Sequence, residues 1–300
     1  MKIDFVLTYV DQNDKFWYKE MKNCAKLHNK LSLSNPARFR DWETLKYIFR
    51  GIEKYMQWIN NVYLVVACES QVPEWINTNK VKVIYHEQII PYKYLPTFNS
   101  NTIELFLHNI PGLQEYFLYS NDDIFIINRT SEKSWFSSTG LPKINVYYKL
   151  CIPTTIYHKT LKNTENLCRK DLNMVFLKNK ILRSDHSINP MRKSTWEYMW
   201  KNYYDDLDNS ITAFRSQENI TQELSNYYHF LNQKFEFHTR NNKYFDFKKN
   251  RIIELNEILF NSSIQHICIN DLGVKDFNTA KEKIHNIFEK KFPNKSKYEN

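Results

Sequence analysis

The chain has 300 residues, of which 42% are hydrophobic and 25% are charged, and this composition excludes a disordered protein because it supplies enough apolar side chains for a core. Forty-two basic against 33 acidic residues give a net charge of +9, which predicts an anionic partner: a phosphate-bearing substrate, nucleic acid or an acidic membrane surface. The five cysteines are scattered and form no CxxC pair, so the sequence indicates neither a disulfide scaffold nor a zinc site.

Neither a targeting signal nor a membrane span is expected. The N-terminal stretch MKIDFVLTYVD is apolar but short, and it contains Asp4, which makes it a poor signal peptide. No apolar run approaches the roughly 18 residues of a transmembrane helix. We therefore expect a cytoplasmic protein with reduced cysteines.

The first 130 residues alternate between apolar runs typical of strands and amphipathic stretches typical of helices. From Asp41, a candidate N-cap, to residue 56, apolar side chains recur at spacings of three and four. This alternation predicts an α/β fold with a mostly parallel sheet covered by helices on both faces. We expect strands at 3–10, 61–67, 81–85 and 116–120, and helices at 41–56 and 101–110.

After residue 130 the pattern becomes irregular. Helices are expected at 194–207 and 221–235, and we interpret residues 190–260 as a helical insertion or lid on the sheet. A last strand at 264–269 and a Lys-rich helix within 279–300 follow. With no internal repeat and no linker, the sequence predicts one α/β domain, residues 1–300, with a helical subdomain.

Two adjacent carboxylates, Asp122 and Asp123, follow Asn121 at the end of the strand YFLYS. Adjacent acids repel each other, at a cost that grows with burial unless a cation compensates. One interpretation is therefore a divalent cation at the carboxyl end of a strand, where open α/β sheets bind ligands. The other is an ordinary β-turn, for which Ser-Asn-Asp-Asp is favourable.

Three further stretches carry candidate binding groups. Asp11 ends the first strand, where a carboxylate can accept hydrogen bonds from a nucleotide, although Asp is common after strands. The guanidinium groups of Arg40 and Arg50 can bind phosphate or lie on a solvated helix face. Asn99 and Ser100 mark a helix start that can bind an anion or serve as an N-cap alone.

His186 lies in the polar segment SDHSINPMRKS, where an imidazole that titrates near neutrality suits acid/base chemistry. The chain has nine histidines, so most must have other roles. Arg192 and Arg215 are candidates for neutralising phosphate, whereas His266 is expected to belong to a strand.

Taken in order, these motifs resemble the four conserved regions of the Stealth family, which comprises bacterial capsular and exopolysaccharide phosphotransferases related to the eukaryotic N-acetylglucosamine-1-phosphotransferase. The first region often reads Trp-Val-Asp-Gly in the family, whereas Tyr9 to Gln12 stand here. The resemblance is dense over 1–130 and patchier to about 275. It rests on IDFVLTYVD, RFRDWETLKYIFRGIEKYMQWINNVYLVV, HEQIIPYKYLPTFNSNTIELFLHNIPGLQEYFLYSNDDIF, DHSINPMRK, FRSQENI and ICINDLG.

This resemblance implies a glycosyltransferase-A-like fold, a cofactor of Mg²⁺ or Mn²⁺, and transfer of a sugar 1-phosphate. The donor would be a nucleotide-diphosphate sugar, bound by residues 1–130 of a single catalytic domain. The acceptor would be a hydroxyl of a glycan or lipid-linked oligosaccharide, and no nucleic acid would be bound. By motif, catalysis falls to His186, Asp123 and Arg215. Donor binding falls to Asp11, Arg40, Asn99, Ser100 and Asn121, and the metal to Asp122, Asp123 and Asp271, with Asn270 beside it.

Two other functions fit parts of the pattern. A metal-dependent glycosyltransferase would use the same fold but release a nucleoside diphosphate. A nucleic-acid binder would explain the charge, but the basic residues are spread out and no recognised motif is present. The last helix, with Ile284, Ile287 and Phe288 flanked by lysines, either attracts the protein weakly to the inner face of an anionic membrane or packs on its own domain.

Overall fold

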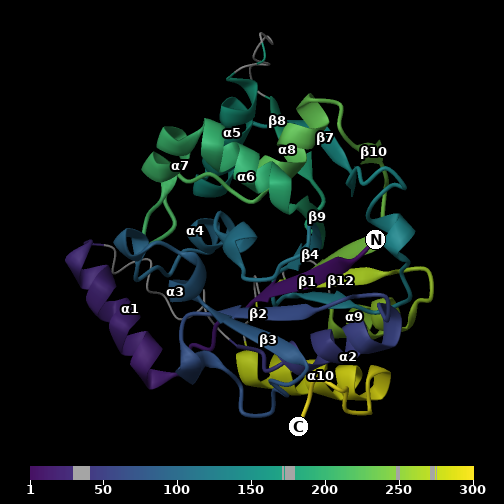
Figure 1. Ribbon diagram of the computed structural model, residues 1–300. Helices are drawn as coiled ribbons and strands as arrows, with labels where there is room; N and C mark the ends of the chain where they lie inside the picture. Colours follow the sequence, from purple (N-terminus) through teal and green to yellow (C-terminus); the bar gives the residue numbers. More distant parts are fainter. Residues whose placement is uncertain (30–40, 171, 173–179, 248–250, 271–273, 275) are drawn as a thin grey trace.

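A five-stranded central sheet organises the molecule (Figure 1). The computed structural model describes residues 1–29, 41–170, 172, 180–247, 251–270, 274 and 276–300. The strand order is β3-β2-β1-β4-β9, in which β9 alone runs antiparallel to its neighbour. The strands are β1 (Ile3–Thr8), β2 (Val62–Val66), β3 (Val81–Tyr85), β4 (Tyr116–Ser120) and β9 (Asn189–Arg192).

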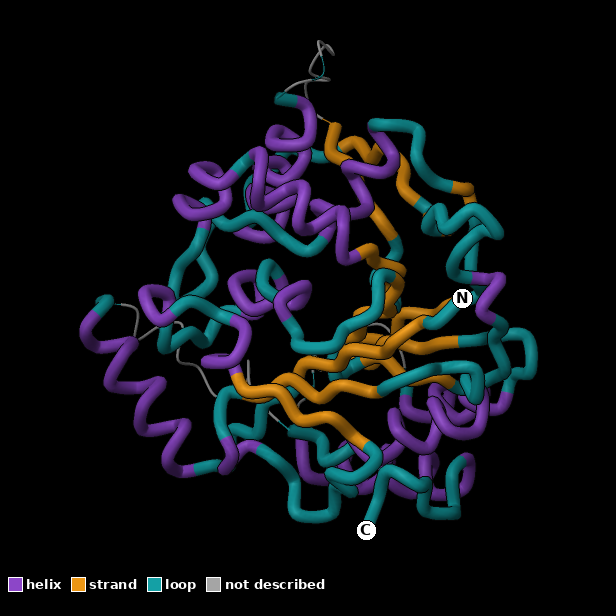
Figure 2. Tube along the Cα trace, in the orientation of Figure 1, coloured by secondary structure: helices purple, strands orange, loops and turns teal. Residues whose placement is uncertain are grey.

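The central strands are buried on both faces, as their continuous apolar sequences predict. In β1, Phe5 and Leu7 face one core and Val6 the other, because successive side chains point to opposite sides. Figure 2 shows helices on both sides of the orange strands. The structure confirms a mixed α/β fold with a mainly parallel sheet flanked by helices, consistent with the glycosyltransferase-A-like expectation.

A second sheet, in the order β11-β12-β5, adjoins the first. Its strands are β5 (Ile124–Ile126), β11 (Asn242–Asp246) and β12 (His266–Asn270), and β5 runs antiparallel to β12. Helix α2 (Leu45–Tyr55) lies close to β5, because Gly51 has no side chain and a Cβ there would lie 2.5 Å from the carbonyl oxygen of Ile126. Because β4 belongs to the first sheet and β5 to the second, the chain passes from one sheet to the other through residues 121–123.

The helical layer lies above the central sheet in Figure 1 and begins earlier in the chain than we expected. Residues 190–260, interpreted as a helical insertion, also contribute β9 and β11 to the two sheets. The layer contains α5 (Ile156–Arg169), α6 (Lys193–Asn202), α7 (Tyr204–Ser210) and α8 (Glu223–Leu231), with β7 (Val146–Leu150) paired to β8 (Lys180–Ser184) and β6 (Lys143–Ile144) paired to β10 (Glu236–Phe237).

Several helices differ from the expected ones. Helix α1 (Lys15–Leu27) was not expected; the Asp14 side chain caps it by accepting from the backbone N–H groups of Phe16 and Trp17. Helix α2 starts after Thr44, so Asp41 is not its N-cap. The expected helix at 101–110 is interrupted and consists of α4 (Ser100–Glu104) and a 3₁₀ turn at Leu107–Asn109. Two further helices are α3 (His86–Ile89) and α9 (Ile252–Phe260).

The last helix, α10 (Phe277–Lys291), packs on its own domain, which was the second of the two alternatives. Ile284 and Phe288 are buried in the core beneath the sheet, and the Phe288 ring stacks on Tyr47 of α2. Its apolar face is therefore covered by protein. Within the described part of the chain, no helix combines the length and apolar character needed to cross a bilayer.

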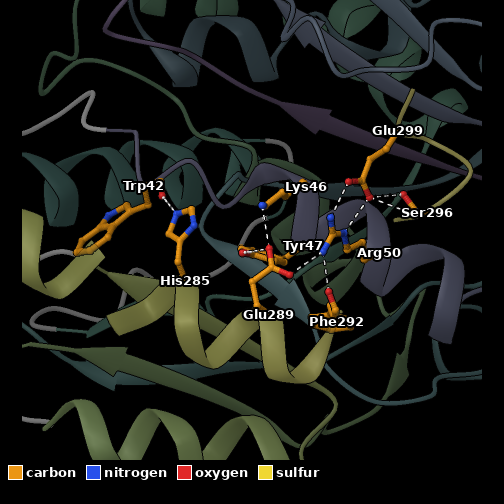
Figure 3. A network of polar contacts seen from close by, with 9 residues as sticks. All are labelled: Trp42, Lys46, Tyr47, Arg50, His285, Glu289, Phe292, Ser296 and Glu299. Atoms are coloured by element: carbon orange, nitrogen blue, oxygen red, sulfur yellow. Dashed lines mark hydrogen bonds and ion pairs between the residues drawn. The ribbon is translucent and has the colours of Figure 1, made fainter. Parts of the chain in front are cut away.

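Arg50 was a candidate for phosphate binding or for a solvated helix face, and the structure shows neither (Figure 3). Its guanidinium is buried and forms a salt bridge of 2.8 Å with Glu299 and another of 3.2 Å with Glu289. Its Nη1 also donates to the carbonyl oxygen of Phe292. Arg50 therefore joins α2 to α10 and to the C-terminal segment.

Candidate active site

Residues Asn121 to Asp123 form the turn that connects β4 to β5. The turn lies at the carboxyl edge of the parallel strands, as the sequence predicts, and the backbone N–H of Ile269 donates to the Asp123 carbonyl oxygen at 2.8 Å. The turn is half-buried, with 30% of the Asp123 side chain exposed. A wet surface turn would screen the two adjacent charges, whereas this position leaves much of their repulsion in place.

A group of acids surrounds Asp122. Burial, the charge of Asp123 and the charge of Asp41 raise the pKa of Asp122 to about 8. Asp41 accepts a hydrogen bond of 2.7 Å from the hydroxyl of Tyr9. Burial also raises the pKa of Asp41, and the nearby charge of Asp11 adds to that rise. Four carboxylates therefore act on one another at this edge of the sheet, and a divalent cation would relieve their repulsion.

Asp11 lies in a loop that is fixed by hydrogen bonds. Its Oδ1 accepts from the backbone N–H of Asn13 at 2.7 Å, and its own backbone N–H donates to Oε1 of Gln71 at 2.7 Å. Gln71 returns a hydrogen bond from Nε2 to the Asp11 carbonyl oxygen. This reciprocal pair holds the end of β1 in place beside the acids. The Gln12 side-chain oxygen next to it is buried without a hydrogen-bond partner among the described residues.

Asp123 makes a second set of contacts on the side of the smaller sheet. Its Oδ2 lies 3.5 Å from Nε2 of His186 and accepts a hydrogen bond of 3.3 Å from the Cys268 thiol. Its Oδ1 is buried and has no hydrogen-bond partner among the described residues. His186 comes from the loop between β8 and β9, and its ring lies edge-on to Tyr244 at 6.0 Å. The β4–β5 turn, the β8–β9 loop and strand β12, which are distant in sequence, thus meet at the Asp123 carboxylate.

The surroundings of His186 favour its protonated form. Burial lowers the pKa of His186, but the hydrogen bond and charge of Asp123, together with the charges of Glu223 and Glu104, outweigh that effect and raise it. Two-fifths of the side chain remains exposed. His186 can therefore exchange a proton with a ligand while Asp123 stabilises the imidazolium.

A buried network supports Asn121. The hydroxyl of Tyr119 lies 2.7 Å from Oδ1 of Asn121, 3.1 Å from Oε1 of Glu104 and 3.1 Å from Oγ1 of Thr8. Burial raises the pKa of Glu104 to about 7, although the charge of Arg215 opposes the rise. Glu104 was not singled out in the sequence, where it stands within the apolar run TIELFL. Glu104 is at the end of α4 and is linked to the turn through the Tyr119 hydroxyl.

Asn99 and Ser100 lie at the start of α4, where Arg215 contacts Ser100. Asn99 is fully buried; it accepts from the backbone N–H of Asn101 as an N-cap and donates to the carbonyl oxygen of Thr212. The side chain therefore positions the loop at the start of α4, and its expected role toward a donor stays a prediction. Ser100 accepts a hydrogen bond of 2.8 Å from Nη2 of the exposed Arg215.

Two expected site residues, Arg40 and Asp271, lie outside the described residues. Asn270 is at the end of β12, whose preceding residues pair with β5 beside the acidic turn. Arg192, a candidate for neutralising phosphate, forms an ion pair of 2.9 Å with Glu115. His266 lies inside β12 with no exposed surface, as expected.

The side chains that could bind a metal suit a hard divalent cation on one side of Asp123 and a softer cation on the other. Asp122 and Asp123 offer carboxylate oxygens, which Mg²⁺ and Mn²⁺ prefer, and the partnerless Oδ1 of Asp123 is the kind of buried atom that a cation would satisfy. Asp123, His186 and Cys268 also place one oxygen, one nitrogen and one sulfur within 4.8 Å of one another. The carboxylates of Asp122 and Asp123 therefore fit the expected Mg²⁺ or Mn²⁺.

Comparison with known proteins agrees with this geometry. Residues 38–144, which include the acidic turn, match the family model described as Stealth protein CR2, conserved region 2. The chain is 32% identical to the capsular polysaccharide phosphotransferase WcwK of Streptococcus pneumoniae over 99% of this chain and 98% of that protein. It is 31% identical to the exopolysaccharide phosphotransferase cps2G of Lactiplantibacillus plantarum over 99% and 96% of the two chains.

A third relative, the receptor polysaccharide phosphotransferase WefC of Streptococcus oralis, is 38% identical over 63% of this chain and 57% of that protein. The likeness to the first two relatives extends over nearly the whole of each chain, and the family model covers the turn that carries Asp122 and Asp123. The chain therefore belongs to the Stealth family and is an enzyme of the transferase class.

Proposed function

We propose that this enzyme transfers a sugar 1-phosphate from a nucleotide-diphosphate sugar, linked to uridine or cytidine, to a hydroxyl of a capsular or cell-surface polysaccharide. Its relatives are named as phosphotransferases of capsular polysaccharide and exopolysaccharide, which supports the reaction class. The observation that carries the proposal to particular residues is the approach of His186 Nε2 to within 3.5 Å of Asp123 Oδ2, beside a second acid. A group that can transfer a proton, His186, thus lies next to the acids that can hold a phosphate-neutralising cation.

In the proposed reaction the acceptor oxygen forms a bond to the β-phosphorus, and the bond from that phosphorus to the bridging oxygen breaks. The nucleoside monophosphate leaves with the electron pair, and the sugar keeps its phosphate. His186 receives the acceptor proton at Nε2, and Asp123 stabilises the imidazolium that results. Arg215 neutralises charge on phosphoryl oxygens, which is the main catalytic task in such transfers.

We propose Mg²⁺ or Mn²⁺ as the metal, held by Asp122 and Asp123. A cation of this kind, when bound, neutralises diphosphate charge that would otherwise repel an approaching hydroxyl. The acids themselves support this assignment, because burial and mutual repulsion already raise the pKa of Asp122 to about 8. Asp11 and Asn121 would then orient the nucleotide and sugar at the end of the sheet.

We also propose that the acceptor is a growing glycan, free or lipid-linked, and that the reaction takes place in the cytoplasm. All five cysteines are free in the structure. This is in keeping with a reducing compartment.

The bond that breaks can be identified from the co-product. Incubating the enzyme with Mn²⁺, a glycan acceptor and a panel of UDP- and CDP-sugars should release a nucleoside monophosphate and leave phosphorus in the glycan. Glu115→Gln, which changes an acid that pairs with Arg192 away from the turn, is the matched control and should behave like the parent. Stoichiometric nucleoside diphosphate with a phosphorus-free product would establish glycosyl transfer instead.

A further inference from the structure

The thiol of Cys268 lies beside the acidic turn and has no role in the proposed phosphotransfer. Cys268 pairs with Ile124 across β12 and β5, which places its sulfur next to Asp123. It donates to Asp123 Oδ2 at 3.3 Å, and the same oxygen lies 3.5 Å from Nε2 of His186. The three donor atoms lie within 4.8 Å of one another.

These distances suit a tetrahedral ion. In zinc sites the bonds to nitrogen and oxygen are about 2.0–2.2 Å and those to sulfur about 2.3 Å, so the ligand atoms of a regular tetrahedron are separated by roughly 3.4–3.7 Å. The two contacts at Asp123 Oδ2 already have nearly this length. A sulfur and an imidazole nitrogen also select Zn²⁺ over Mg²⁺, which prefers an all-oxygen set.

We propose that Asp123, His186 and Cys268 form a binding site for a thiophilic divalent cation, with Zn²⁺ as its representative. Binding displaces the thiol proton, and the three protein ligands leave a fourth position open to water. The ion uses Asp123, so it competes with a hard cation held by Asp122 and Asp123. It also occupies the Nε2 lone pair of His186, so Zn²⁺ inhibits the enzyme, a consequence that rests on the proposed function.

Co²⁺ provides a test that does not depend on activity. Chelator-treated, reduced protein titrated with Co²⁺ should develop a thiolate-to-metal absorption band that saturates at one equivalent and disappears when Zn²⁺ is added. Cys268→Ser should abolish the band. Cys151→Ser is the matched control, because Cys151 also lies beside an imidazole, with its sulfur 3.3 Å from Nδ1 of His158. This variant should retain the band.

His186→Ala keeps the test decisive if Cys268→Ser does not fold, because His186 is partly exposed and its removal opens no core cavity. In this variant the affinity for Zn²⁺ should fall more than about tenfold, since even outer-shell partners of a metal contribute that much. A band that survives in Cys268→Ser, or an affinity unchanged in His186→Ala, would overturn the site. A parent protein that shows the band but releases no nucleoside monophosphate from any donor refutes the proposed function and supports the site.

Discussion

His186 lies between solvent and the carboxylate of Asp123, and both neighbours affect how it can act. The exposed part of the ring can meet an acceptor hydroxyl, whereas the 3.5 Å approach to Asp123 Oδ2 stabilises the imidazolium. The pKa of His186 is raised above its usual value by Asp123, although burial opposes the rise. A histidine that receives a proton must first be neutral, so its neutral fraction grows as the pH rises through that raised pKa.

We therefore expect His186→Ala to lower kcat by roughly 10²- to 10⁴-fold, the usual contribution of a proton-transfer group, with donor binding nearly unchanged. The parent should show an ascending limb of kcat/KM against pH with its midpoint above 6.5, and the variant should lack that limb. His238→Ala, at a half-buried histidine of another loop, is the control. Turnover within a few-fold of the parent would assign proton transfer to a different residue.

His266 is a buried histidine that makes the folded protein less stable at acidic pH. Its ring lies 5.3 Å from that of Trp135, and neither ring nitrogen has a hydrogen-bond partner among the described residues. Burial lowers the pKa of His266 to about 3. Between that pH and about 6.5 the unfolded chain binds a proton that the folded protein excludes, so the free energy of unfolding falls as the pH falls.

His266→Phe should remove this dependence while filling a similar volume. Between pH 7.5 and 5.0 the free energy of unfolding should fall by about 2 kcal/mol less in the variant than in the parent. Urea denaturation at the two pH values measures the difference directly. Equal pH dependence in the two proteins would show that the folded state accommodates the charged imidazole.

Among the elements, the strands of the central sheet were predictable because each is a short apolar run bounded by polar residues. Strand β9 was not, because Pro190 and the polar residues around it are typical of a loop. Proline is tolerated there since β9 is an edge strand, where one side of the backbone needs no ladder partner. Helix α1 was missed because its start depends on the Asp14 cap within the polar stretch DQND.

The candidate site, like the fold, was predictable only in part. Asp122 and Asp123 could be placed because a strand end is visible in the sequence. Glu104 and Cys268 could not. Glu104 is linked to the turn by the contact of α4 with the Tyr119 hydroxyl, and Cys268 lies beside Asp123 because β12 pairs with β5. Scattered cysteines without a CxxC pair gave no sign that one of them would meet Asp123.

The clamp between α2 and the C-terminal segment gives a prediction at the scale of elements. The Arg50 and Glu299 side chains are only 8% and 5% exposed, so removing the Glu299 charge leaves the buried guanidinium with only its longer ion pair to Glu289 and the Phe292 carbonyl. Hydrogen bonds from Arg50 keep the pKa of Glu299 below its usual value despite burial. This contribution to stability is thus present above about pH 4.5 and is lost as the pH falls through the lowered pKa.

Glu299→Gln should lower the free energy of unfolding by about 2–4 kcal/mol at pH 7, measured by urea denaturation. Lys46→Met is the matched control, because Lys46 forms a more exposed ion pair with Glu289 of the same network (Figure 3). It should cost less than about 1 kcal/mol. Equal losses in both variants would mean that burial does not determine the strength of this clamp.

For the whole molecule, the edge between the two sheets combines function with a cost in stability. The Asp122 carboxyl has a pKa of about 8, far above that of an unfolded aspartate, so the folded state retains a proton that the unfolded state has lost. Its favourable contribution is complete below about pH 4 and disappears as the pH rises through 8. At pH 8 the metal-free protein therefore carries repulsion among Asp122, Asp123 and Asp41 that a bound cation would remove.

Asp122→Asn tests this trade-off in the intact chain. At pH 8 without metal the variant should melt at a higher temperature than the parent, by on the order of a few degrees, because it lacks the repelling charge. Millimolar Mn²⁺ should raise the melting temperature of the parent, more at pH 8 than at pH 6 because protons compete for Asp122, and the variant should respond much less. Glu115→Gln should reproduce the parent in every condition. A parent that is indifferent to Mn²⁺ at both pH values would contradict the assignment of Asp122 as a metal ligand, because relief of carboxylate repulsion must appear as stability of the folded state.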